Sequence, residues 1–174
     1  MKTTLTALAL VFAALGPATA ADDAAAISKQ IAGKWIEATG KRDPAALAAL
    51  FTKDAVMLPP NVAQPIVGEA AIRAYFDKAM QQPPAQNLAI PATEAKMLDA
   101  NTLFGAGTWS ADFPGKDGGP STHGGGTWLA VDAREGTEWK IRANTWQTLQ
   151  PPAGQPAVAA APAAGASGSS APGK

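Results

Sequence analysis

The sequence predicts an α+β fold in which helices pack on one face of an antiparallel sheet. Between residues 27 and 80, apolar residues recur mainly with the three- and four-residue spacing of helices. Between residues 86 and 148 they alternate with other residues, as they do in strands. A group of helices followed by a group of strands is typical of the α+β class. No internal repeat divides the chain, so we expect one domain over residues 22–150.

The first two helices are predicted by periodicity and by a start signal. Ile27, Ile31 and Trp35 recur every four residues and predict an amphipathic helix that ends near Gly40. The pair Asp43-Pro44 predicts the start of a second helix, because aspartate is a preferred N-cap and proline fits the first turn. The apolar face of this second helix is expected to carry Leu47, Leu50 and Phe51.

A short strand and a third helix are expected next. The run AVML at residues 55–58 predicts a strand that stops at Pro59-Pro60. Gly68 precedes the third helix. The apolar face of that helix is expected to carry Ile72, Phe76 and Met80.

The second half of the domain is expected to form an antiparallel meander. A loop rich in glycine and proline at residues 113–121 and a turn at residues 134–137 separate its later strands. The predicted strands are residues 86–99, weakened by Pro91, and residues 103–113, 122–131 and 138–148.

The only histidine, His123, is followed by three glycines. His-Gly-Gly-Gly forms an oxyanion hole in some esterases, which also need a Gly-x-Ser-x-Gly elbow and a second histidine as base. The chain has neither, so the pattern excludes this type of esterase. Glycines within a strand mark a bulge or the close approach of another group, and we expect Gly124–Gly126 to serve the sheet in this way.

The two ends of the chain differ from the domain. Residues 1–20 combine Lys2, an apolar run and a final Ala-Thr-Ala, which is the pattern of a secretory signal peptide. We therefore expect cleavage after Ala20, a periplasmic or secreted protein, and no membrane association after cleavage. Residues 151–174 consist almost entirely of alanine, proline, glycine and serine, and we expect a disordered tail.

The composition excludes several functions. Fourteen basic and fourteen acidic residues give a net charge of zero, and no basic stripe suits nucleic acid. The chain has no cysteine and one histidine, so we expect neither a metal site nor a cofactor.

Three stretches resemble the nuclear transport factor 2-like superfamily, and most of all its SnoaL-like and ketosteroid-isomerase-like branches. They are KWIEATGKRDPAALAALFTKDAVMLPP, PIVGEAAIRAYF and EWKIRANTWQ, within residues 27–148. The resemblance implies a curved, mixed sheet that three helices wrap into a cone with an apolar pocket inside.

The same resemblance implies that ketosteroid isomerase chemistry is absent. Those isomerases use a tyrosine on the first helix and two aspartates in the pocket. The matching positions here are Trp35, Pro59 and, approximately, Thr127. None of these side chains can replace the acid or the base.

By resemblance, alternate strand residues and the helices line the pocket. Tryptophans around a few polar groups suit a planar or apolar ligand with one polar handle, although tryptophans also simply fill cores. If Arg142 points inward, it needs a carboxylate from Glu37, Asp54, Asp112 or the ligand. The expected lining is Trp35, Phe51, Met57, Phe76, Trp109, His123, Thr127, Arg142, Asn144 and Trp146.

Three functions remain open at this stage. The first is a protein that binds a small apolar molecule without chemistry of its own. The second is an isomerase, dehydratase or cyclase in which His123, helped by Asp112, acts as base. The third is an association domain that forms a homodimer through an outer face carrying Trp128. If the protein is an enzyme, we expect His123 to contact an acid and to open into the pocket. If it is a binding protein, we expect His123 to be solvated at a strand end.

Overall fold

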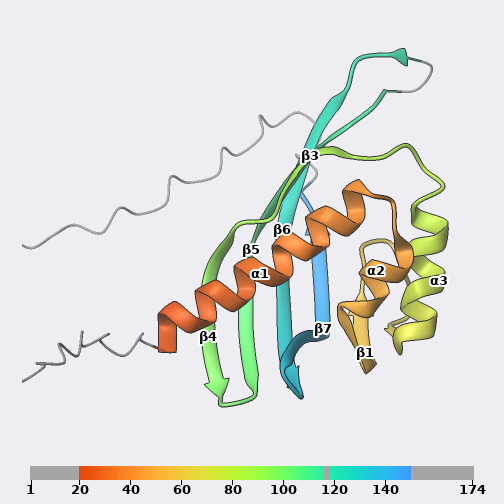
Figure 1. Cartoon of the computed structure of the whole chain (residues 1–174). Helices are drawn as coiled ribbons and strands as arrows, with labels where there is room; N and C mark the ends of the chain where they lie inside the picture. The colour runs from red at the N-terminus through yellow and green to blue at the C-terminus, as the bar shows by residue number, and fades with distance from the viewer. Residues whose placement is uncertain (1–19, 116–117, 150–174) are drawn as a thin grey trace, which may run out of the picture.

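The computed structural model describes residues 20–115 and 118–149, which form one curved, unclosed, mixed sheet with three helices (Figure 1). The predicted α+β class and the predicted cone-shaped sheet are therefore confirmed. The expected signal peptide, apart from Ala20, and the expected tail of residues 151–174 lie outside the described residues.

The helices are α1 (Ala20–Gly40), α2 (Pro44–Ala49) and α3 (Glu69–Ala79). Helix α1 runs diagonally across the sheet, and α2 and α3 lie beside it (Figure 1). The side chain of Asp43 accepts a hydrogen bond of 2.9 Å from the backbone N–H of Ala46, which confirms the predicted N-cap. None of the described helices is long and apolar enough to cross a membrane.

The strands are β1 (Phe51–Leu58), β2 (Ile66–Val67), β3 (Gln86–Ala89), β4 (Ala92–Asp99), β5 (Thr102–Phe113), β6 (Thr122–Glu135) and β7 (Glu138–Thr148). The sheet has the strand order β2-β1-β7-β6-β5-β3, and β4 also pairs with β5. Strand β1 is parallel to β7, and the other pairs are antiparallel.

Several predicted bounds differ from the structure, and two of the differences change how an element is assigned. Phe51 was expected in the second helix but begins β1, because its backbone pairs with Ile141 of β7 and the carbonyl of Leu50 accepts a hydrogen bond from the N–H of Ile141. The strand expected at residues 86–99 is divided at Ile90-Pro91 into β3 and β4, which pair with different parts of β5. Proline has no N–H for the ladder, which accounts for the break.

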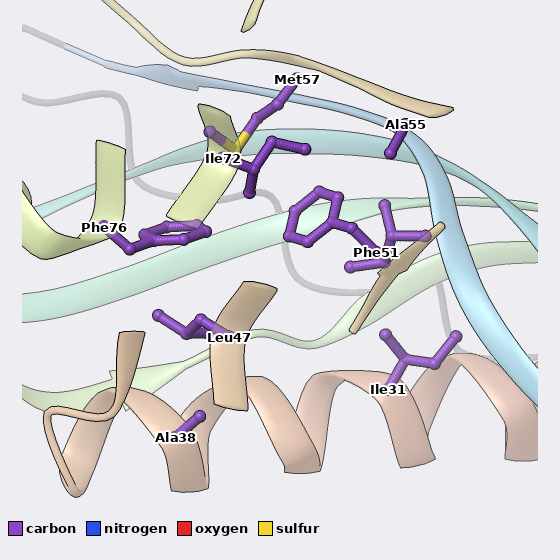
Figure 2. Packing of buried hydrophobic residues seen from close by; sticks show 9 residues of the cluster. Ile31, Ala38, Leu47, Phe51, Ala55, Met57, Ile72 and Phe76 are labelled. Carbon is purple, nitrogen blue, oxygen red and sulfur yellow. The ribbon is translucent and has the colours of Figure 1, made fainter. Parts of the chain in front are cut away.

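The core lies where α1, α2 and α3 pack against β1 (Figure 2). Phe51 and Met57 of β1 are completely buried there, together with Ile72 of α3. Trp35 of α1 packs edge-on against Phe76, with ring centroids 5.6 Å apart. This core holds α1 and α3 in place beside the sheet.

Candidate functional site

A cavity of about 540 Å³ lies between the helices and the sheet. Its volume is within the usual range for pockets that hold small molecules. Helices α1 and α3, the segment from Gln82 to Ile90, and strands β5, β6 and β7 all contribute to its wall. Most of the wall is apolar, and its aromatic residues are Trp35, Tyr75, Phe76, Trp109, Phe113, Trp128 and Trp146.

Five of the residues expected in the pocket line the cavity. They are Trp35, Phe76, Trp109, Asn144 and Trp146. Phe51 and Met57 do not, because both are fully enclosed in the core.

The face of β6 that lines the cavity is the opposite of the expected one. Residues paired directly across two strands share a face of the sheet, and the cavity-lining Trp109 of β5 pairs with Gly126, two residues before Trp128. Trp128 therefore lines the cavity, whereas His123 and Thr127 do not. Because side chains alternate, an error of one residue exchanges the whole strand between the two faces. The expected exposure of Trp128 on the outer face was wrong, and the homodimer remains a prediction without that support.

Arg142 was also expected to face inward, and it does not. The register between β6 and β7 shifts at this point, because Val131 pairs with Ala143 but Asp132 pairs with Ile141. The extra residue, Arg142, interrupts the alternation in β7. Its guanidinium Nη2 lies 3.3 Å from Oδ2 of Asp54, with both side chains more than half exposed. The carboxylate partner of Arg142 is thus Asp54, one of the three protein carboxylates expected as candidates. The pair lies outside the cavity.

The cavity contains a buried carboxyl group that sequence reasoning missed. Asp132 of β6 lines the wall, its exposed fraction is 2%, and its Oδ1 atom has no hydrogen-bond partner. Burial raises the pKa of Asp132 to about 7. The available signal was an acidic residue inside the apolar run WLAVDA, two and four residues after Ala130 and Trp128.

Asn144 of β7 provides a second unsatisfied oxygen. Its Nδ2 donates a hydrogen bond of 3.2 Å to the backbone carbonyl of Leu129, which fixes the orientation of the amide. Its Oδ1 is buried and has no partner. Asn144 pairs with Ala130, and Asp132 follows Ala130 by two residues in β6, so Asp132 and Asn144 lie on the same face of the sheet and both line the cavity. The wall of the cavity therefore offers two buried oxygens without a hydrogen-bond partner.

Glycines allow two tryptophan rings to lie flat against the strands. Trp128 donates from Nε1 to the carbonyl of Thr108 at 3.0 Å, and a Cβ atom on Gly107 would lie only 3.0 Å from that nitrogen. Trp109 is similarly held beside Gly126. The prediction that Gly124–Gly126 permit the close approach of other groups is confirmed, because a Cβ atom at each of them would meet a neighbouring strand or side chain too closely. Since both indole N–H groups are already bonded to the backbone, the rings offer the cavity mainly their apolar surfaces.

His123 and Asp112 form a pair, but they do not line the cavity. Nδ1 of His123 lies 2.7 Å from Oδ1 of Asp112, and the amide of Asn87 donates to Oδ2 of Asp112, also at 2.7 Å. The hydrogen bond from Asn87, followed by that with His123, lowers the pKa of Asp112. The His123 side chain is 72% exposed near the start of β6. The histidine thus contacts an acid, as expected for an enzyme, but is solvated at a strand end, as expected for a binding protein.

A curved mixed sheet wrapped by three helices around an apolar cavity defines the class of nuclear transport factor 2-like proteins. Within this class, the family model of the SnoaL-like domain matches residues 32–139, and the chain belongs to that family. No curated protein matches the chain in sequence.

Solved structures share the fold at low sequence identity. A ketosteroid isomerase-like protein from Erwinia carotovora atroseptica is 18% identical with a TM-score of 0.65, covering 75% of this chain and 99% of its own. A conserved protein from Planctomyces limnophilus is 19% identical with a TM-score of 0.60, covering 71% and 96%. An NTF2-like protein of unknown function from Shewanella oneidensis is 16% identical with a TM-score of 0.56, covering 70% and 96%.

Proposed function

We propose that the protein binds a small, planar, apolar molecule in the cavity between α1, α3 and the sheet. The observation that carries the proposal is a largely apolar cavity of about 540 Å³ with four tryptophans in its wall. Burial of apolar surface contributes roughly 25 cal/mol per Å², so an aromatic ligand gains its affinity mainly from these walls. We further propose that binding occurs after export, on the strength of the signal-peptide pattern of residues 1–20.

Tight packing of some tryptophans does not remove the space for a ligand. Trp35 contacts Phe51, Phe76 and Trp146, with ring centroids between 5.6 and 6.2 Å apart, and so also fills the core. Trp109 and Trp128 instead lie on the sheet and leave the cavity open in front of them. Trp35 therefore fills the core, which is one of the two roles considered from the sequence, and the position of Trp109 and Trp128 supports the proposed binding role.

The binding proposal can be tested with a neutral fluorescent probe, N-phenyl-1-naphthylamine. Ala130 of β6 lines the cavity, whereas Ala133 of the same strand does not. We expect saturable binding to the wild type, at least tenfold weaker binding to Ala130→Phe, and little change in Ala133→Phe. Urea unfolding of both variants checks that they are folded. Equal binding to all three proteins, or no saturable binding to the wild type, would contradict the proposal.

Acid–base catalysis on the bound ligand is a second candidate function, favoured by Asp132. A carboxyl group with a pKa of about 7 can both give and accept a proton at neutral pH. An isomerase, dehydratase or cyclase would use this group rather than His123, which does not line the cavity. The test is to identify a co-purifying ligand by native mass spectrometry and follow its conversion by the wild type and Asp132→Asn. Conversion that the variant retains in full would contradict this role.

A further inference from the structure

We propose that the ligand carries a primary ammonium group, which binds between Asp132 and Asn144 while the planar part lies against the tryptophans. The inference rests on the proposed binding function and adds the chemical class of the ligand, a flat hydrophobic amine. Three features of the wall support it: the unsatisfied oxygens, the distribution of charge and the exposed ring faces.

The first feature is the unsatisfied carboxylate of Asp132. The exposed fraction of the residue is 2%, and Oδ1 accepts no hydrogen bond. Buried polar atoms in native proteins nearly always have a partner, and an unpaired charged group is especially costly. A donor brought by a ligand would satisfy this oxygen.

The second oxygen determines how many donors the ligand must bring. One N–H of the Asn144 amide donates to the carbonyl of Leu129, and the buried atom of this side chain without any partner is the acceptor Oδ1. Two unsatisfied acceptors in the wall of one cavity require at least two N–H or O–H groups from a ligand that satisfies both. A single hydroxyl donates one hydrogen bond and a carbonyl none, whereas a primary ammonium donates three. The hydroxyl of Ser28, which also lines the cavity, can accept the third.

The distribution of charge favours a cation. Among the described residues that line the cavity, Arg42 is the basic one, and its guanidinium donates to the backbone carbonyls of Met80 and Gln82. The residues that pair with Asp132 across the sheet are Leu103 and Ile141, which do not titrate. Burial alone accounts for the raised pKa of Asp132.

Tyr75 and Arg134 do not add a charge to the wall of the cavity. Tyr75 lines the cavity, and its pKa is raised by burial, so it is neutral at neutral pH. Arg134, two residues after Asp132, instead lines a separate hollow with Asp23 and Asp99. Asp132 therefore supplies the one charge that faces the cavity without a partner among the described residues.

The ring faces complete the site. The indole N–H groups of Trp109 and Trp128 are bonded to backbone carbonyls, so these rings present π surfaces. Such surfaces attract cations and pack well against flat apolar groups. An aromatic amine matches both properties in one molecule.

The experiment compares two probes with the same ring system, 2-naphthylmethylamine and 2-naphthalenemethanol, by titration calorimetry at pH 8.0 and pH 5.5. In the wild type we expect the amine to bind at least tenfold more tightly than the alcohol at pH 8.0. Because protonation of Asp132 removes the charge that attracts the amine, its affinity falls about thirtyfold at pH 5.5. The affinity of the alcohol changes little.

Two variants test whether the preference for the amine depends on the charge of Asp132. Asp132→Asn is expected to abolish the preference for the amine and to leave the alcohol bound as in the wild type. Asp112→Asn, which changes an acid outside the cavity, is expected to keep both affinities. If Asp132→Asn does not fold, the pH dependence of the wild type still decides the question.

The outcomes distinguish the two proposals. Alcohol binding equal to or tighter than amine binding at pH 8.0, or an amine affinity that is the same at both pH values, would overturn the ammonium inference and leave the apolar binding function intact. Failure of both probes, together with N-phenyl-1-naphthylamine, to bind saturably would overturn both.

Discussion

Trp109 donates a hydrogen bond of 3.0 Å from its indole Nε1 to the backbone carbonyl of Gln147, two strands away in the sheet. The residue between them is Gly126, which pairs directly with Trp109. A Cβ atom on Gly126 would overlap the carbonyl oxygen of Gln147 and lie 2.7 Å from Nε1 of Trp109. The third glycine after His123 therefore leaves the space in which a cavity-lining tryptophan is anchored.

Gly126→Ala is expected to lower the free energy of unfolding by about 2–3 kcal/mol, because either the strands or the indole must move to relieve the overlap. The measurement is urea unfolding followed by tryptophan fluorescence. Gly33→Ala is the matched control, since Gly33 is an exposed position of α1 with nothing near its added Cβ. Alanine there should stabilise the protein by about 0.5–1 kcal/mol. Equal effects of the two substitutions would show that crowding at Gly126 is unimportant.

Asp132 is expected to make the protein less stable as the pH rises. Its pKa is about 7 in the folded protein and near 3.8 when it is exposed, so the folded state holds the proton more tightly. The stabilising effect of protonation is complete below pH 4, declines by up to about 1.4 kcal/mol per pH unit, and is lost above pH 7. Asp132→Asn removes this dependence. The difference in unfolding free energy between variant and wild type, measured in urea from pH 4 to pH 8, should therefore shift in favour of the variant.

Asp43→Ala is expected to destabilise the protein by about 1 kcal/mol, because the N–H of Ala46 loses its capping acceptor. Asp43→Ser, which keeps a capping oxygen, should recover most of the loss. Thermal unfolding monitored by circular dichroism measures both. A serine variant no more stable than the alanine variant would argue against the cap as the cause.

Arg142→Ala is expected to leave both the unfolding midpoint and the affinity for the cavity probe unchanged within error. The Arg142–Asp54 pair is exposed and lies outside the cavity, and exposed ion pairs contribute little. The pKa of Asp54 is lowered first by the hydrogen bond that Asp54 accepts from Thr52 and then by the attraction of Arg142. The pair therefore remains charged at neutral pH. A marked loss of probe binding in Arg142→Ala would show that the side chain reaches the cavity in solution.

The sequence by itself determined the features that depend on neighbouring residues. Asp43-Pro44 marks the start of α2, Gly68 precedes α3, and Pro59 ends β1. These signals act through the backbone conformation and hydrogen bonds of a few adjacent residues, so they can be recognised without knowledge of the fold. The family resemblance then added the curved sheet and its cavity.

Only the tertiary structure decided which side chains enter the cavity. Pairing of Gly126 with the cavity-lining Trp109 puts Trp128 on the cavity side of β6 and turns His123 and Thr127 away from it. The extra residue at Arg142 reverses the alternation within β7. Both depend on the register between strands, and a shift of one residue exchanges the faces without changing the local pattern. For this reason the sequence shows Asp132 only as an acidic residue within an apolar run, and its place in the wall of the cavity is decided by the pairing of the strands.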